Sequence, residues 1–297
     1  MSRILISGLV NTETTVRVRG FPVEYYPIDY PFFGVNTAVA GVGYNLTKAL
    51  RTLGDDVTLL SMTGDDFAAS YIRSEMEALG VGAAHIRRSL SQTPSSVVLY
   101  DEQGRRQIYC DLKDIQDTPY DFGDAPLDSA DLVVACNINY NRPLLHAARV
   151  AGKTIATDVH VLRDIYDDYN SEFMACADIL FLSDEGVGDG YEDFMRELAR
   201  VYGSRIIVMG RGAKGAAIYT KDSGCVAALP AEHVGGTVNT VGAGDALFSA
   251  FLHGYAGGME PIRALRRAQL FAAAKIRVSG AAQGFITEAG LDALERR

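Results

Sequence analysis

The sequence predicts an α/β fold, a three-layer α/β/α sandwich with a mostly parallel central sheet and a smaller β excursion. Short apolar, β-rich runs alternate with amphipathic helical stretches along most of the chain, which is typical of parallel strands covered by helices on both faces. Hydrophobic residues make up 48% and charged residues 22% of the sequence, as in an ordinary globular protein. No linker, repeat or low-complexity segment interrupts the pattern, so residues 1–297 are expected to form a single domain.

Each element is predicted from its local signal. Strands are expected where short runs rich in apolar and β-branched residues occur, at 3–7, 56–61, 132–136, 154–158, 179–182 and 205–209. Hairpins with glycine in the turn are expected at 95–110 and 216–229. Helices are expected where apolar residues recur every three or four positions, at 46–53 with an earlier start near Gly41, up to Leu79 from a cap at Asp65 or Asp66, and at 142–151, 171–176, 191–202, 243–256 and 261–278.

Residues 9–35 lack a helical period and contain three prolines. Six aromatic residues crowd this segment: Phe21, Tyr25, Tyr26, Tyr30, Phe32 and Phe33. The structural interpretation is a twisted strand pair or flap packed on the body, and the functional one is a lid with an aromatic lining; both can hold. Because nucleobases stack on aromatic rings, a nucleoside is an alternative ligand for this segment.

Charge and cysteine content exclude several classes of protein. The formal net charge is −9 and no Lys/Arg cluster is longer than a pair, so we expect no nucleic-acid partner. The four cysteines show neither a CxxC motif nor metal-ligand spacing, which favours reduced thiols and a cytoplasmic location. The chain shows no signal peptide and no apolar run long enough for a bilayer, so we expect no membrane association.

Polar residues follow the predicted strands, where a parallel sheet places its ligands. The residues expected in this crevice are Gly8 to Glu13, Asn137, Asn139, Asp158, His160, Ser183 to Glu185 and Gly210 to Gly215. Asn, Asp and Glu side chains hydrogen-bond hydroxyl groups, so a polyol is a reasonable ligand. The run Gly210–Gly215 also matches GxGxxG, but it leads into a predicted strand and not a helix. A dinucleotide oxidoreductase is therefore only the third hypothesis.

The stretch from Asn239 to Phe248 predicts a loop that turns into a helix, with Gly242 and Gly244 in the first turn. Free backbone N–H groups and the helix dipole at such a start attract anions, and glycine allows a phosphate to approach closely. Asp245 is unexpected there because a carboxylate repels phosphate. A helix N-terminal acid explains Asp245 alone, whereas a general base acting on a hydroxyl explains it together with the glycines.

These residues resemble a known family. Asn239–Phe248 is similar to the D-T-x-G-A-G-D-x-F signature of ribokinase-like (PfkB-type) carbohydrate kinases, and Gly41–Asn45 to their G-G-x-x-x-N box. Further segments resemble family motifs in the same order: Gly8–Glu13 (G-x-x-N-x-D), Thr63–Phe67 (G-x-D-x-F), Asp158–Arg163 (D-x-N-x-x-R) and Gly212–Gly215 (G-x-K-G). Together the matches cover most of the chain.

The resemblance implies transfer of the γ-phosphate of ATP to a hydroxymethyl group of a sugar or related polyol. It implies Asp245 as the general base and an anion hole made by Gly242, Ala243 and Gly244. The implied ligand contacts are Asn11, Glu13, Gly41, Asn45, Asn137 and His160 for the substrate, and Ser183, Gly210, Gly212 and Gly215 for the nucleotide. Mg²⁺ would bridge the phosphates near Asp184 or Glu185. Many members also use a monovalent cation such as K⁺, and a β lid over 9–35 and 93–112 would pair two chains into a homodimer.

Several positions depart from the family motifs. Asn239 and Glu13 each stand where the family motif has Asp, and Glu13 has a side chain one methylene longer. His160 stands where the motif has Asn, and Ser183–Gly186 stands where it has N-x-x-E. Val42 stands where some members carry a Lys, which predicts a neutral acceptor and not a sugar phosphate. The near rival is a nucleoside kinase of the same fold. The rival from another class is a catalytically weak sugar or nucleotide sensor.

Overall fold

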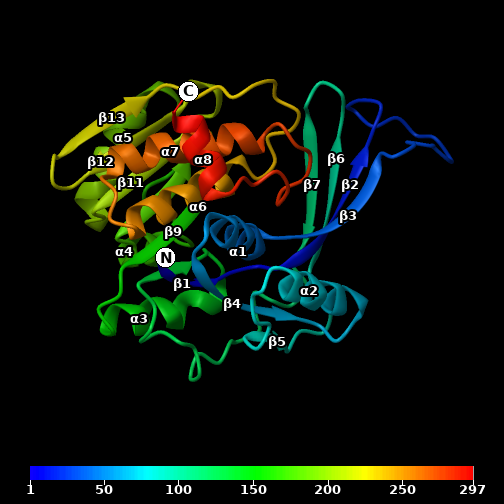
Figure 1. Cartoon of the computed structure of the whole chain (residues 1–297). Helices are drawn as coiled ribbons and strands as arrows, with labels where there is room; N and C mark the ends of the chain where they lie inside the picture. Colours follow the sequence, from blue (N-terminus) through cyan, green and yellow to red (C-terminus); the bar gives the residue numbers. More distant parts are fainter. Residues whose placement is uncertain (297) are drawn as a thin grey trace.

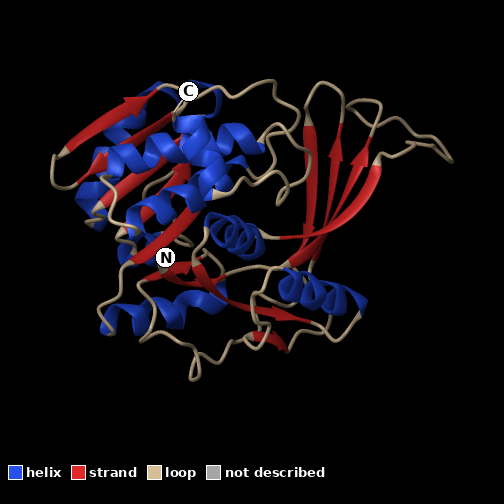
Figure 2. Ribbon diagram, in the orientation of Figure 1, coloured by secondary structure: helices blue, strands red, loops and turns tan. Residues whose placement is uncertain are grey.

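A nine-stranded sheet forms the centre of the molecule in the computed structural model, which describes residues 1–296 (Figures 1 and 2). Its strand order is β13-β12-β11-β10-β9-β8-β1-β4-β5. The strands are β1 (Arg3–Ser7), β4 (Asp56–Thr63), β5 (Ile86–Arg88), β8 (Leu132–Ala135), β9 (Ile155–Val161), β10 (Ile179–Ser183), β11 (Ile206–Gly210), β12 (Ala216–Thr220) and β13 (Cys225–Leu229). From β5 through β4, β1, β8, β9 and β10 to β11, neighbouring strands pair in parallel. Only β12 and β13 pair in antiparallel fashion.

Helices cover both faces of this sheet, as predicted. One core contains apolar residues of α1 (Val42–Leu53), α2 (Phe67–Ala78), α6 (Ala243–Ala256), α7 (Pro261–Lys275) and α8 (Glu288–Glu295). The other contains residues of α3 (Arg142–Val150), α4 (Ser171–Cys176) and α5 (Tyr191–Tyr202). Within β1, Ile4 and Ile6 belong to the first core and Leu5 to the second, because successive strand side chains point to opposite faces. The three-layer sandwich is therefore confirmed.

The lid is a separate four-stranded sheet of order β3-β2-β6-β7 that projects from the body (Figure 1). Its strands are β2 (Asn11–Arg17), β3 (Val35–Ala40), β6 (Ser95–Tyr100) and β7 (Arg106–Asp111). The predicted bounds of 9–35 are wrong at their end, since β3 extends to Ala40 and no strand forms between Arg17 and Val35. Three prolines in that interval lack the N–H that a strand ladder needs. Its aromatic residues are largely exposed, Phe33 fully so.

The run Gly210–Gly215 opens no helix of the kind that a dinucleotide needs. One 3₁₀ turn, Gly212–Lys214, separates β11 from β12, which confirms the sequence-based argument against a dinucleotide fingerprint. Among the α-helices and strands, β5 and α8 were not predicted. β5 has only three residues, and Thr287 caps α8 by accepting from the Gly290 N–H at 3.3 Å. Within residues 1–296, no helix is both long and apolar enough to cross a bilayer.

Candidate active site

Asp245 lies in the first turn of α6, directly after the glycine loop. Gly242 caps the helix in the left-handed region at φ 76°, and a Cβ there would lie 2.2 Å from the Ala281 carbonyl oxygen. Only glycine fits this position. The Ala243 N–H donates to the Thr240 carbonyl at 3.1 Å, whereas the N–H groups of Gly242 and Gly244 have no hydrogen-bond acceptor among the described residues. The N–H groups of Gly242 and Gly244 are therefore free donors at a helix N-terminus, whereas the N–H of Ala243, which was also predicted for the anion hole, is already bonded within the loop.

Asn45 holds the Asp245 carboxylate from the opposite end of the chain. Its Nδ2 donates to Asp245 Oδ2 at 2.7 Å, and the two residues lie in the first turns of the neighbouring helices α1 and α6. Burial raises the pKa of Asp245, and the Asn45 hydrogen bond and the charge of His160 oppose that shift. A carboxylate whose pKa lies above its usual range accepts a hydroxyl proton more readily at neutral pH, which suits a general base.

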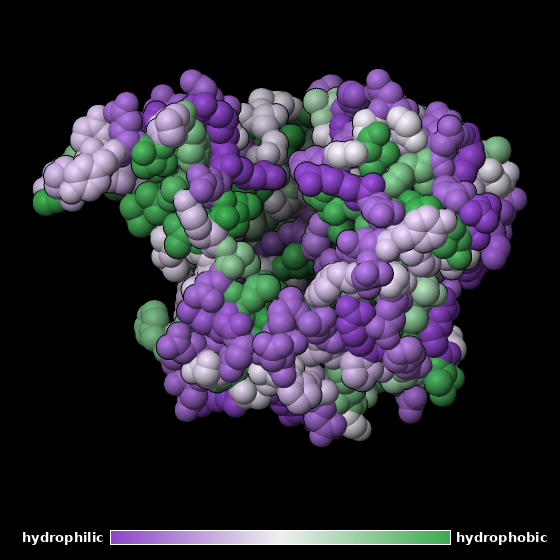
Figure 3. Space-filling model, turned by 180° about the vertical axis from the view of Figure 1, so that it is seen from behind, coloured by the Kyte–Doolittle hydropathy of each residue, from purple (hydrophilic) through white to green (hydrophobic). Residues whose placement is uncertain are grey.

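Charged groups from both sheets surround this carboxylate. Glu13, on β2 of the lid, is half-buried, and its pKa is raised by this partial burial and by the nearby charge of Asp245. Asp158 lies within β9, which extends to Val161 and not only to residue 158 as predicted. It also acts on Asp245, and its own pKa is lowered because the neighbouring His160 outweighs the effect of burial. The predicted residues Glu13, Asn45, His160 and Asp245 therefore come together, with Glu13 contributed by the lid and the other three by the body. The surface of the molecule is hollowed between these two parts (Figure 3).

His160 takes an unusual backbone conformation at the end of β9. Its φ is 59°, and the pairing of β9 with β10 shifts by one residue at this point, which marks a bulge. The bulge places the imidazole Nδ1 3.5 Å from Asp158 Oδ2. The Asp158 charge raises the pKa of His160 to about 9, so the ring is a cation at neutral pH. A cation at this edge of the sheet lowers the repulsion between Asp245 and a triphosphate.

Two buried amide oxygens in the site lack a hydrogen-bond donor among the described residues. They are Asn11 Oδ1 and Asn45 Oδ1, whose amide nitrogens donate to Ser96 Oγ at 3.2 Å and to Asp245. Buried acceptors normally find a donor, because an unpaired one costs about 1–3 kcal/mol. Hydroxyl groups of a bound polyol would supply such donors.

Gly41 and Gly43 serve backbone packing beneath the site. A Cβ on Gly41 would lie 2.6 Å from the Leu9 carbonyl oxygen, and one on Gly43 would lie 2.7 Å from the Gly8 carbonyl carbon. The Gly43 N–H donates to the Leu9 carbonyl at 2.9 Å. These contacts fix the start of α1 against the β1–β2 connection, and thereby position Asn45 and Asn11.

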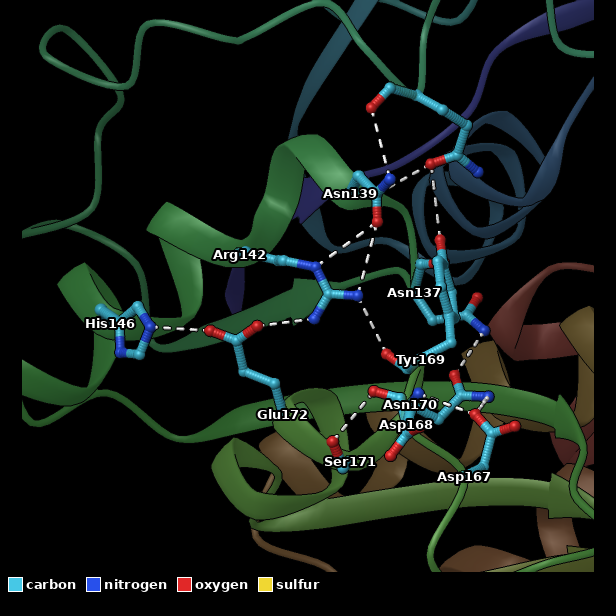
Figure 4. Close-up of polar contacts among 11 residues, drawn as sticks. Asn137, Asn139, Arg142, His146, Asp167, Asp168, Tyr169, Asn170, Ser171 and Glu172 are labelled. Atoms are coloured by element: carbon cyan, nitrogen blue, oxygen red, sulfur yellow. Dashed lines mark hydrogen bonds and ion pairs between the residues drawn. The ribbon is translucent and has the colours of Figure 1, made fainter.

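Asn137 follows β8 and belongs to a polar network at the rim (Figure 4). Its Nδ2 donates to Asn170 Oδ1 at 3.0 Å, and its carbonyl accepts from the Tyr169 hydroxyl at 3.0 Å. In the same network, Arg142 donates to the Tyr169 carbonyl and to Glu172, while its guanidinium lies over the Tyr169 ring (Figure 4). The network fixes Asn137 but uses its amide N–H, leaving its side-chain oxygen as the group available to a ligand.

Of the predicted nucleotide residues, Ser183 ends β10 and Gly210 ends β11, while Gly212 and Gly215 lie in the connection between β11 and β12. Gly215 has a φ of 93°, and a Cβ there would lie 2.2 Å from the Leu229 carbonyl oxygen, whereas the surroundings of Gly212 are open. Gly210 accepts from the Asp184 N–H at 2.9 Å, and Ser183 Oγ accepts from the Glu185 N–H at 3.3 Å. A tight glycine turn beside exposed backbone leaves room for the planar base of a nucleotide.

The carboxylates of Asp184 and Glu185 differ in their fitness for Mg²⁺. The Asp184 carboxylate lies 3.9 Å from Arg211 Nε, whereas the exposed Glu185 carboxylate has no ion pair in the described chain. Oxygen ligands of this kind suit Mg²⁺, which typically takes one or two carboxylates and completes its shell with phosphates and water. No group of three or more His, Cys, Asp or Glu within residues 1–296 could hold a metal ion by itself. Glu185 is the better fit of the two.

Two further residues at the site were not predicted from the sequence. Lys275, at the end of α7, is buried and donates from Nζ to the Val241 carbonyl. Arg106, on β7 of the lid, donates from Nη1 to Thr240 Oγ1 at 3.1 Å. A sequence signal for Lys275 exists, since it continues the buried helical face formed by Ala264, Ala268 and Phe271.

The sequence matches the pfkB family carbohydrate kinase description over residues 1–288. The chain belongs to this family. An ATP-dependent ribose-1-phosphate kinase of Halopiger xanaduensis is 27% identical over 262 residues, which cover 85% of this chain and 84% of that protein. Family membership makes the chain a phosphotransferase with an alcohol group as acceptor.

Two solved structures share the fold. A microbiome-derived acarbose kinase, Mak1, has a TM-score of 0.87 at 22% identity, covering 100% of this chain and 99% of that one. A nucleoside kinase of Burkholderia thailandensis in complex with inosine has a TM-score of 0.79 at 18% identity, covering 99% and 98%. Both likenesses confirm the ribokinase-like architecture.

Proposed function

We propose that the protein is an ATP-dependent kinase that transfers the γ-phosphate to a hydroxymethyl group of a sugar or related polyol. One observation carries the proposal: the Asp245 carboxylate, of raised pKa, stands in the first turn of α6 beside free amide donors, with hydroxyl-binding groups around it. The name of the Halopiger relative supports ATP as the phosphate donor.

In the proposed mechanism, Asn11, Glu13 and Asn45 orient the acceptor so that one hydroxyl faces Asp245. Asp245 takes the hydroxyl proton as the oxygen attacks the γ-phosphorus in line with the leaving ADP oxygen. The amide N–H groups of Gly242 and Gly244 receive the charge of the transferring phosphoryl group, and such preorganised donors typically contribute about 3 kcal/mol each. Mg²⁺ would be held beside Glu185 and would neutralise phosphate charge when bound.

The test is ATP turnover, measured as ADP release, across neutral sugars, polyols, ribose 1-phosphate and nucleosides. We expect a neutral sugar or polyol to stimulate ADP release and Asp245→Asn to lower kcat about 10²- to 10⁴-fold. Asp222→Asn, in the exposed β12–β13 turn, is the matched control and should keep full rate. Full rate in Asp245→Asn, or no stimulation by any acceptor, would refute the mechanism; the second outcome would favour the sensor hypothesis. Replacing K⁺ by tetramethylammonium in the same assay tests the monovalent cation.

A nucleoside acceptor is the second candidate, supported by the inosine complex of the structural neighbour. The aromatic residues that suggested base stacking lie in the loop between β2 and β3, where Tyr25 is 89% and Phe33 100% exposed. Their exposure gives them little contact with a ligand in this conformation. A neutral sugar or polyol therefore stays the first candidate.

We also propose a homodimer formed through the outer face of the lid. Register places Val35, Val97 and Tyr109 on the face opposite Glu13, and these residues are 55%, 38% and 54% exposed. Apolar side chains gathered on one face of a small sheet favour burial against another surface. The lid of a second copy offers a self-complementary surface of this kind.

A further inference from the structure

Lys275 is the one fully buried lysine among the described residues, with a relative exposure of 0%. It occupies the last turn of α7, on the helix face that Ala264, Ala268 and Phe271 bury against the sheet. A lysine at a helix C-terminus usually extends into solvent, where it interacts with the helix dipole at little cost. This side chain instead points inward, to the loop that precedes α6.

The Lys275 ammonium contacts a backbone carbonyl and no carboxylate. Nζ donates to the Val241 carbonyl, and no Asp or Glu of residues 1–296 forms an ion pair with it within 4.0 Å. The charged groups that act on it from farther away are Asp245 on α6, Glu13 on β2 and Arg106 on β7. The first two favour its charge and Arg106 opposes it. Burial outweighs the carboxylates and lowers the pKa of Lys275 to about 8, so the amine is still mostly protonated at pH 7.

The Val241 carbonyl belongs to the same peptide unit as the Gly242 N–H. In a trans peptide the carbonyl and the N–H point in opposite directions, so an ammonium bound to the oxygen fixes the direction of the N–H. A positive charge at the oxygen also polarises the amide and makes its N–H a stronger donor. Asn239 Oδ1, which accepts from the Val241 N–H at 2.7 Å, fixes the preceding peptide unit.

We propose that Lys275 is a positioning residue for phosphoryl transfer, whose ammonium orients and polarises the Val241–Gly242 peptide so that the Gly242 N–H binds the transferring phosphoryl group. The inference rests on the proposed function, because it takes the glycine loop as the site of the γ-phosphate. A buried charge without a carboxylate partner destabilises the folded state, and the proposal gives that charge a role in the site.

The test replaces Lys275 by Met, which keeps the length and removes the charge. We expect kcat to fall about 10- to 100-fold while the KM of the acceptor stays within twofold, because the contact acts on the transferring group and not on acceptor binding. Lys153→Met is the matched control. Lys153 also donates to backbone carbonyls, those of Asp128 at 2.7 Å and Ala130 at 2.9 Å, but it precedes β9 and so lies at the amino ends of the parallel strands, away from the site.

A binding measurement separates this inference from the proposed function. Calorimetric titration with ADP and with the ATP analogue AMP-PNP reports the contribution of the γ-phosphate without turnover. We expect Lys275→Met to bind ADP normally and AMP-PNP about 10-fold more weakly, and millimolar methylammonium to restore part of the loss in Lys275→Ala.

The outcomes distinguish the two proposals. A wild type that turns over no acceptor but shows the expected AMP-PNP loss in Lys275→Met refutes the proposed function and supports the role of Lys275. A folded Lys275→Met that keeps kcat and the AMP-PNP/ADP ratio within twofold overturns that role, as does a wild type that binds neither nucleotide. If Lys275→Met does not fold, Lys275→Gln, which can still donate to the carbonyl without a charge, is judged by the same criteria.

Discussion

Replacing Lys275 by Met should make the protein more stable at neutral pH while it damages catalysis. The pKa of this amine falls from an ordinary 10.5 to about 8 in the folded chain. At about 1.4 kcal/mol for each tenfold change in proton affinity, carrying the charge costs the folded state about 3 kcal/mol. Loss of the hydrogen bond to the Val241 carbonyl costs about 1 kcal/mol. The variant should therefore gain about 2 kcal/mol in the free energy of unfolding at pH 7.

The sign of this gain depends on pH. Below pH 8 the amine is protonated in both the folded and the unfolded chain, so the wild type carries the full cost of burying the charge. Between pH 8 and 10.5 the unfolded chain binds more protons than the folded one, so wild-type stability rises relative to the variant. Above 10.5 only the hydrogen bond differs, and the wild type should be the more stable by about 1 kcal/mol.

Urea unfolding of both proteins at pH 7, 8.5 and 10, followed by circular dichroism, measures this difference directly. The difference in unfolding free energy reports the removal of the Lys275 amine together with its effect on the pKa values of Glu13 and Asp245, which its charge lowers. A difference in unfolding free energy that does not change between pH 7 and pH 10 would show that folding does not shift the pKa of the Lys275 amine, and would refute the reasoning.

Three further outcomes are expected. Asn45→Ala removes the hydrogen bond that opposes the raised pKa of Asp245, so the acidic limb of kcat/KM against pH should move to higher pH; an unmoved limb would contradict Asp245 as the base. Gly242→Ala should lose activity and about 2 kcal/mol or more of stability in thermal unfolding, because its Cβ meets the Ala281 carbonyl, whereas Gly244→Ala, with open space around it, should fold normally. Val97→Asp should convert dimers to monomers in light scattering after gel filtration without lowering the melting temperature, and a wild-type monomer would refute the lid dimer.

Local patterns were sufficient for most of the fold. The buried strands and the helices of both layers follow from apolar periodicity, since each has enough residues to show its period. β5 has three residues, too few for any period to show. α8 was missed although Thr287 provides a cap signal, because its eight residues bury only Leu291.

The site was predicted less completely because its contacts span the chain. Asn45 and Asp245 are 200 residues apart, and only the packing of α1 beside α6 brings them together. The family resemblance pointed to both residues, but it did not indicate the charge of His160 or the contact of Arg106 with Thr240. Lys275 escaped prediction for a physical reason: a lysine in the last turn of a helix is ordinarily a solvated residue that favours the dipole.

The bond between Asn45 and Asp245 also has a consequence for biosynthesis. A ribosome completes β1, β4 and β8 to β11 before it reaches α6. A nascent chain can therefore assemble the parallel part of the large sheet before Asp245, the proposed general base, has been made. A product that stops before residue 243 would therefore split no ATP. It would also leave uncovered the apolar sheet face that α6 and α7 bury, a surface that chaperones and proteases recognise.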